Sequence, residues 1–146
     1  MLVGERAFFS KEPMANILVY EGDSHERNLV RLLLEGLRHR VREAETASEL
    51  FFILDAGRPD LAIFGLHLWR EENVNVLRRF QAMAPDVPAL AMISGDLERT
   101  QELRSCLESP KAIAILEQPV HPYRLLVQVK NALMKPAEWI NGQHKL

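Results

Sequence analysis

Short apolar runs alternate with amphipathic stretches along most of the chain. Residues 17–20 form a continuous apolar run, which is typical of a strand buried on both faces. Further runs predict strands at 41–45, 61–64, 89–93 and 113–116. Residues 41–45 carry more charge than the others, which favours a position at the edge of a sheet.

Helical periodicity fills the intervals between these strands. Asp23 and Glu26 have the spacing of a capping box and precede leucines at helical intervals, which predicts a helix over about 24–39. Thr46 and Glu49 repeat this spacing, and we expect the second helix to end at Gly57. The remaining helices are predicted between a loop at 65–72 and Pro85, over 97–107, and from Pro122 to Leu133.

This alternation predicts the α/β class. Parallel strands need long crossover connections, so we expect a doubly wound, five-stranded parallel sheet with helices on both faces. The functional crevice of such a sheet lies at the carboxyl ends of its strands. Chemistry is therefore expected at 21–23, 65–68, 94–96 and 117–119.

The 146 residues are expected to form one domain at 16–134, after a flexible extension at 1–15 and before a tail or linker at 135–146. The single cysteine excludes a disulfide framework and a multi-cysteine metal site. A formal charge of −2 argues against direct nucleic-acid contact, and no apolar run reaches membrane-spanning length. We expect a cytoplasmic protein.

Four segments carry a family resemblance. In order and spacing, residues 16–134 resemble a response-regulator receiver domain of the CheY type, which implies a flavodoxin-like (βα)5 fold. The matching segments are ILVYEGD (17–23), RPDLAIFGLHL (58–68), VPALAMISGD (87–96) and ILEQP (115–119).

The resemblance implies a phosphorylation site whose chemical groups are mostly missing here. Receiver domains phosphorylate an aspartate at the position of Gly65, which has no side chain. The two acids that hold Mg²⁺ correspond to Glu21 and Gly22, and the lysine that pairs with the phosphoryl group corresponds to Gln118. The switch hydroxyl remains as Ser94.

The aromatic switch position of the family is Ile115 in this chain. These changes agree with one another, because a neutral side chain at position 118 costs less to hold there than an ammonium group without acidic partners. We therefore predict a degenerate pseudo-receiver that lacks a metal site and needs no cofactor.

Several polar residues at this rim have two interpretations. Glu21 is either a remnant metal ligand or a solvated or hydrogen-bonded carboxylate, and we favour the second. Asp23 is expected to cap a helix, although it is also a candidate crevice contact. For Ser94 we favour a turn or capping residue over a switch hydroxyl, and for Gln118 a local hydrogen bond over a ligand contact. His67 is a candidate crevice contact that replaces a lost charge or senses pH, or else it faces solvent from a loop, and we favour the loop.

Two surfaces are candidates for partner contact. Arg27, Arg31 and Arg38 fall within about 40° of one another on the first predicted helix, and we favour a solvated face over an acidic partner. The resemblance implies an output face on the last two helices and the fifth strand. Its mixed charge and aromatic character suits a protein partner, an output domain or a homodimer. The candidate residues are Arg99, Arg104, Tyr123, Arg124 and Gln128.

We predict a non-enzymatic signalling module that acts by protein–protein interaction without phosphorylation. It would be the regulatory domain of a bacterial response regulator or transcription factor. The alternative is a small-molecule or nucleotide sensor that uses the emptied crevice. An enzyme is disfavoured, because the sequence reveals no nucleophile–base pair.

Overall fold

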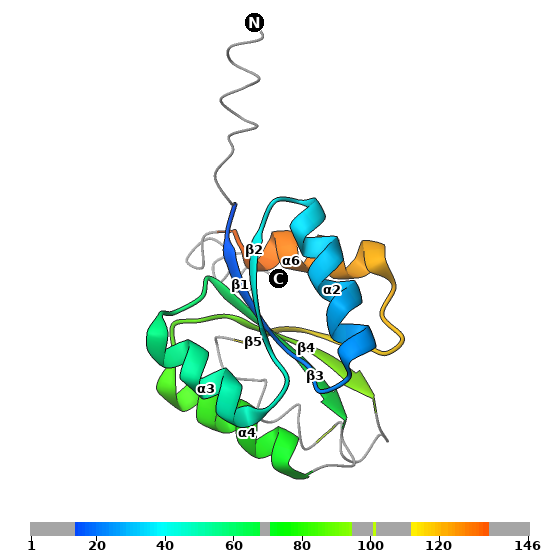
Figure 1. Ribbon diagram of the computed structural model, residues 1–146. Helices are drawn as coiled ribbons and strands as arrows, with labels where there is room; N and C mark the ends of the chain where they lie inside the picture. Colours follow the sequence, from blue (N-terminus) through cyan, green and yellow to red (C-terminus); the bar gives the residue numbers. More distant parts are fainter. Residues whose placement is uncertain (1–13, 68–70, 95–100, 102–111, 135–146) are drawn as a thin grey trace, which may run out of the picture.

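The computed structural model describes residues 14–67, 71–94, 101 and 112–134, and its strands form one parallel sheet (Figure 1). The strands are β1 (Asn16–Tyr20), β2 (Arg40–Ala44), β3 (Leu61–His67), β4 (Ala89–Ser94) and β5 (Ala112–Glu117). Their order across the sheet is β2-β1-β3-β4-β5, and every neighbouring pair is parallel. The predicted five-stranded sheet is confirmed, with β2 at an edge.

Helices cover both faces of this sheet. They are α2 (Ser24–Gly36), α3 (Ala47–Ala56), α4 (Glu71–Met83) and α6 (Pro122–Ala132). Helices α2 and α6 lie on one face, and α3 and α4 lie on the other (Figure 1). The predicted helix at 97–107 lies outside the described residues except for Gln101, and so do most of the N-terminal extension and the whole tail.

Each face of the sheet has its own apolar core. Leu18, Phe64 and Phe80 belong to the core under α3 and α4, where the rings of Phe64 and Phe80 meet edge to face at a centroid distance of 5.0 Å. Ile17 and Leu90 belong to the core under α2 and α6. Burial on both faces explains why these strands read as continuous apolar runs.

Helix α2 ends earlier than the periodicity predicts. Arg38 has a φ of 70°, a left-handed conformation that usually favours glycine at this position. Its N–H donates to the carbonyl of Glu35 (2.9 Å), and the N–H of His39 donates to that of Leu34 (3.2 Å). This is the Schellman arrangement, and it places Arg38 outside the helix.

The expected loop at 65–72 is wrong at both of its ends, and residues 68–70 lie outside the described residues. Gly65, Leu66 and His67 continue β3 and pair with β4, and α4 already begins at Glu71. Strand β3 is buried through Leu66, so the apolar run extends across the glycine, a residue that the pattern assigned to a turn. Ser94 also ends strand β4 rather than lying in a turn.

Candidate functional site

The carboxyl ends of β1, β3 and β4 bring three polar side chains together. Glu21 follows β1, His67 ends β3 and Ser94 ends β4, with His67 and Ser94 paired across the two strands. The N–H of Glu21 donates to the carbonyl of Ala44 at the end of β2 (3.0 Å), which fixes the chain where it leaves the sheet. This is the edge at which the strand pattern predicts function.

Glu21 is fully buried, and its carboxylate fills the space beside Gly65. A Cβ atom built on Gly65 would fall 2.1 Å from Oε1 and 2.6 Å from Cδ of Glu21. Oε2 accepts a hydrogen bond from the N–H of Asp23 (3.0 Å), whereas Oε1 is buried without a hydrogen-bond partner. Of the two forms that we favoured for Glu21, the hydrogen-bonded carboxylate is confirmed and the solvated one is wrong.

His67 links Glu21 to Ser94. Its Nε2 atom lies 3.3 Å from Oε2 of Glu21, and its Nδ1 atom lies 2.8 Å from Oγ of Ser94. Its side chain is 21% exposed, and its backbone carbonyl accepts a hydrogen bond from Nδ2 of Asn73 (2.8 Å). The favoured interpretation of a solvent-facing loop histidine is wrong, because His67 belongs to a strand and turns toward the buried acid.

Asp23 caps α2 as predicted. Its Oδ1 atom accepts hydrogen bonds from the N–H groups of His25 (2.9 Å) and Glu26 (3.1 Å). The bond from Glu26, and after it the bond from His25, hold the pKa of Asp23 below its ordinary value of 3.8. Thr46 and Glu49 form the second predicted capping box, at the start of α3.

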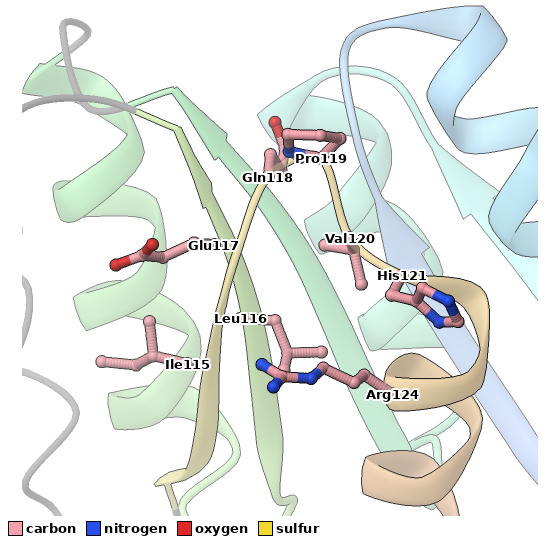
Figure 2. A pocket seen from close by; sticks show the side chains of 8 residues that line it. All are labelled: Ile115, Leu116, Glu117, Gln118, Pro119, Val120, His121 and Arg124. Atoms are coloured by element: carbon pink, nitrogen blue, oxygen red, sulfur yellow. The ribbon is translucent and has the colours of Figure 1, made fainter.

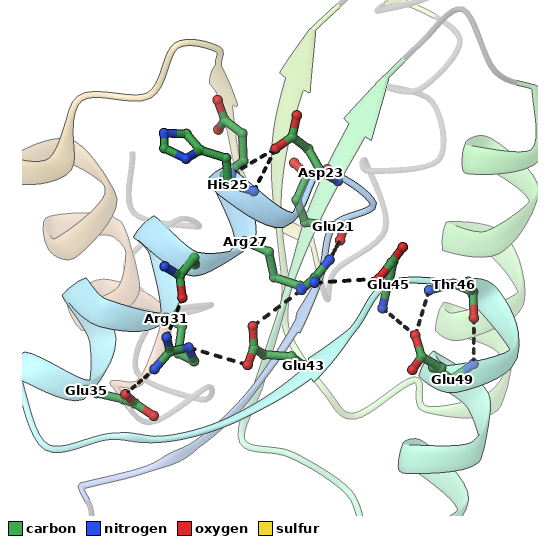
Figure 3. Close-up of polar contacts among 12 residues, drawn as sticks. Glu21, Asp23, His25, Arg27, Arg31, Glu35, Glu43, Glu45, Thr46 and Glu49 are labelled. Atoms are coloured by element: carbon green, nitrogen blue, oxygen red, sulfur yellow. Dashed lines mark hydrogen bonds and ion pairs between the residues drawn. The ribbon is translucent and has the colours of Figure 1, made fainter.

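Arg27 holds the chain at the exit of β1 (Figure 3). Its Nη1 atom donates to the backbone carbonyl of Glu21 (2.8 Å), and its Nε atom donates to Glu43 on β2 (3.3 Å). Arg31 also pairs with Glu43, at 3.4 Å, and with Glu35 of its own helix. The predicted solvated arginine stripe is therefore wrong: Arg27 and Arg31 bind acids of this domain.

Gln118 and Ile115 lie on β5 and just after it. The backbone N–H of Gln118 donates to the carbonyl of Ile93 (2.8 Å), but its side-chain Nε2 atom is buried without a hydrogen-bond partner. The expected local hydrogen bond of this side chain is thus not made by Nε2. Ile115 is half-buried and packs against the core under α3 and α4.

A crevice of about 260 Å³ opens beside Gly65 and His67. Gly22, Glu45 and Thr46 line one part of it, and Glu72, Asn73 and Val76 of α4 line another. The charged groups among these lining residues are carboxylates, apart from the titratable His67. Within the described residues, no group of three or more His, Cys, Asp and Glu side chains is arranged to hold a metal ion.

A second hollow, of about 620 Å³, lies between β5 and the start of α6 (Figure 2). Its lining includes Gln118, His121 and Arg124. His121 caps α6 by accepting from the N–H of Tyr123 (3.1 Å), whose side chain is 70% exposed. Arg99 and Arg104 of the expected output face lie outside the described residues, whereas Tyr123 and Arg124 are exposed and Gln128 is half-buried.

Sequence reasoning missed two residues that build this site. Asn73 is buried, although it is polar, and it holds the backbone at His67. Arg27 was assigned to a solvated surface, yet it binds the backbone of Glu21. The position of Asn73 beside the apolar Val74 and Val76 is a weak signal for burial, because periodicity alone does not separate a buried amide from an exposed one.

Among curated proteins, the chain is similar to transcriptional regulators. It is 30% identical over 79 residues to the virulence transcriptional regulatory protein PhoP of Salmonella typhimurium. These residues make up 54% of this chain and 35% of that protein. It is 29% identical over 76 residues to the transcriptional regulatory protein PhoP of Escherichia coli K12. The chain thus spans about a third of the length of these relatives. No family model matches it.

Solved structures share the fold. The response regulator receiver domain protein (CheY-like) from Methanospirillum hungatei has a TM-score of 0.69 and 23% identity, and the match covers 89% of this chain and 96% of that one. NtrX from Brucella abortus in complex with ADP has a TM-score of 0.71 and 22% identity, over 90% of this chain and 28% of NtrX. The predicted flavodoxin-like fold is confirmed. Within the described residues, no helix combines the length and the apolar character of a membrane span.

Proposed function

We propose, on the premise that sequence similarity and fold support a response-regulator receiver domain, that this domain regulates a partner without taking a phosphoryl group. It acts through protein–protein contact, either with an output domain or with a second copy of itself. Its relatives named PhoP are transcriptional regulatory proteins. Their names support a role for this chain as the regulatory domain of a response regulator, which we place in the cytoplasm.

The observation that carries this proposal is the position of the Glu21 carboxylate. Gly65 offers no acceptor oxygen, and the space beside it is already filled by Oε1 of Glu21. Glu21 does not replace the missing acceptor, because it has no exposed surface from which to attack a phosphodonor. Glu21 thus takes the place of a side chain on Gly65, while the crevice stays open beside it.

The charges around the crevice support the same conclusion. Glu45 and Glu72 are among the lining residues of the crevice, and the described part of this lining includes no lysine or arginine. The described lining thus offers no cation of its own to a phosphoryl group, and Arg27, which lies outside the lining, is engaged with Glu45 and Glu43. Gln118 supplies no charge at the position where the resemblance implies a lysine.

The test is intact-mass analysis after incubation with acetyl phosphate and Mg²⁺. We expect no phosphoryl adduct on this chain. A receiver domain that carries the acceptor aspartate is treated in parallel and must become phosphorylated for the assay to count. One hydroxylamine-labile phosphoryl group on this chain would contradict the proposal, since it would show a working acyl-phosphate site.

A second candidate function is the recognition of a small molecule in the crevice. Its volume of about 260 Å³ is close to the lower end of ligand pockets, roughly 300 Å³. Gly22 lines this space, and a Cβ there would meet the carbonyl of Glu45 at 3.8 Å, an ordinary contact. Gly22→Ala therefore narrows the crevice without a clash.

Thermal-shift measurements against nucleotides and small metabolites test this alternative. A ligand of the crevice should raise the melting temperature of the wild type, and Gly22→Ala should weaken that shift. Gly36→Ala is the matched control, because a Cβ at Gly36 meets no atom within 4 Å and lies outside the crevice lining. An equal shift in all three proteins would place the ligand elsewhere.

A further inference from the structure

Glu21, His67 and Ser94 form a continuous polar chain across three strand ends. The carboxylate and the imidazole are 3.3 Å apart, and the imidazole and the hydroxyl are 2.8 Å apart. The carboxylate is fully buried, while His67 and Ser94 are half-buried and thus partly reachable from solvent. A hydroxyl, a base and an acid in this order are the elements of an activated nucleophile.

The 3.3 Å contact with Glu21 favours one tautomer of His67. An ionised carboxylate can only accept hydrogen bonds, so the imidazole Nε2 atom that faces Glu21 is favoured as the protonated one. The Nδ1 atom then keeps its lone pair, and the hydroxyl of Ser94 must donate to it. The proton that a serine has to lose is therefore already directed at a base.

We propose that Ser94 is a nucleophile toward small activated esters, with His67 as its general base and Glu21 as the positioning residue for His67. Oγ of Ser94 attacks the carbonyl carbon of the ester, and its proton passes to Nδ1 of His67. The bond from carbon to the leaving oxygen breaks, and His67 returns the proton to the departing alcohol. Water then releases the acid from the acyl-serine by the same route.

The buried carboxylate suits the charge that forms in this step. When the imidazole takes the proton of Ser94 it becomes a cation, and Glu21 lies beside its other nitrogen. Oε1 of Glu21 has no hydrogen-bond partner, whereas Oε2 accepts from the N–H of Asp23. A buried anion of this kind gains more from a neighbouring cation than an exposed one does.

The crevice indicates the class of ester. His67 lines the crevice and also contacts Oγ of Ser94, whereas Ser94 and Glu21 are not among its lining residues. Glu45, which pairs with Arg27 at 3.6 Å, and Glu72 are the carboxylates of its described lining. They disfavour an ester that carries a free carboxylate or phosphate group. A small neutral or cationic acyl ester fits both the volume and the charge.

This inference is independent of the proposed regulatory function. Whether position 65 accepts a phosphoryl group does not determine whether Ser94 reacts with an ester. The two tests also use different reagents, so either proposal can fail without the other. The reagent here is a small neutral fluorophosphonate. It reacts with an activated serine and does not depend on the recognition of a particular substrate. Oγ of Ser94 forms a bond to phosphorus, the bond from phosphorus to fluorine breaks, fluoride leaves, and the serine proton goes to His67.

Intact mass and peptide mapping should find one phosphonyl group on Ser94 of the folded full chain. Ser94→Ala should abolish the label, whereas Ser48→Ala, which alters an exposed serine on α3, should leave it unchanged. Absence of label on the wild type, or label that survives in Ser94→Ala, would overturn the proposal. In the first case the three contacts are structural only.

The roles of His67 and Glu21 need a readout that separates chemistry from structure. His67→Ala should slow labelling by about 100-fold or more, and added imidazole should restore part of the rate. Glu21→Gln keeps the shape of the Glu21 side chain, and it should lower the labelling rate by a smaller factor than His67→Ala does. Labelling at the wild-type rate in a folded His67→Ala variant would overturn the assignment of the base, as would a slowed variant that imidazole does not rescue.

Discussion

The carboxylate of Glu21 occupies the space into which a side chain on Gly65 would project. Gly65 lies in β3, and Glu21 directly follows the neighbouring strand β1. A Cβ on Gly65 would fall 2.1 Å from Oε1 of Glu21. Neither residue explains the site alone. The glycine provides the space, and the glutamate closes it.

Gly65→Ala should therefore destabilise the fold. The added methyl group forces the carboxylate out of a buried position, and overpacking of this kind costs about 1–3 kcal/mol. Urea unfolding of wild type and variant measures the difference in the free energy of unfolding.

The double variant Glu21→Ala/Gly65→Ala is the control for this contact. Its alanine at position 21 removes the atoms that the new methyl group would meet. Gly65→Ala should therefore lower the free energy of unfolding much less in the Glu21→Ala background than in the wild type. Strictly additive effects would mean that the two side chains do not compete for the same space.

Restoration of the acceptor should also depend on Glu21. Gly65→Asp alone should remain unphosphorylated with acetyl phosphate and Mg²⁺, because Glu21 still fills the site and Gln118 supplies no charge. Replacing the four degenerate positions together (Glu21→Asp, Gly22→Asp, Gly65→Asp and Gln118→Lys) should allow an acyl phosphate to form. Intact mass measures both variants, and phosphorylation of Gly65→Asp alone would show that Glu21 yields easily.

The strands and helices could be predicted from the sequence, because continuous burial along a strand leaves an unbroken run of apolar residues. The apolar run at 17–20 and the caps at Asp23 and Thr46 depend on local rules, and the structure confirms them. The same rules stopped β3 at Gly65, since a glycine after an apolar run resembles a turn. Arg38 was placed in a helix because a left-handed φ at a residue other than glycine has no signal in the pattern.

The polar chain at the rim could not be predicted in the same way. Periodicity indicates which face of a strand a residue occupies, but it does not determine how a long side chain turns at the end of a strand. Glu21 and His67 turn inward because Gly65 leaves space and Asp23 offers a backbone N–H. Both conditions come from residues that are distant in sequence or irregular in structure.

Stability should fall as the pH is lowered, because of His39. Burial lowers the pKa of His39 below its ordinary value of 6.5, so the unfolded chain binds the proton more tightly than the folded one. The contribution is complete above pH 6.5 and is lost progressively as the pH falls below it. Urea unfolding between pH 8 and pH 5 should show this loss, and His39→Gln should reduce the slope. An unchanged slope would assign the loss to other groups.

Tyr123 should contribute to self-association rather than to folding. Its side chain is 70% exposed at the start of α6, beside the exposed Arg124, so Tyr123→Ala should change the free energy of unfolding by no more than about 0.5 kcal/mol. An exposed tyrosine next to an arginine is the type of pair that is enriched in protein interfaces. If the domain pairs through this face, sedimentation velocity over a range of concentrations should find a dimer for the wild type and a weaker one for Tyr123→Ala.

The matched control for this face is Phe52→Ala. Phe52 is 77% exposed, but it lies on α3, on the opposite side of the sheet from α6 (Figure 1). Loss of an aromatic side chain there should leave the dimer intact if pairing uses the face of α6. A dimer that is weakened by Phe52→Ala and not by Tyr123→Ala would move the interface to the other face, and a wild type that stays monomeric at every concentration would leave an output domain or another protein as the partner.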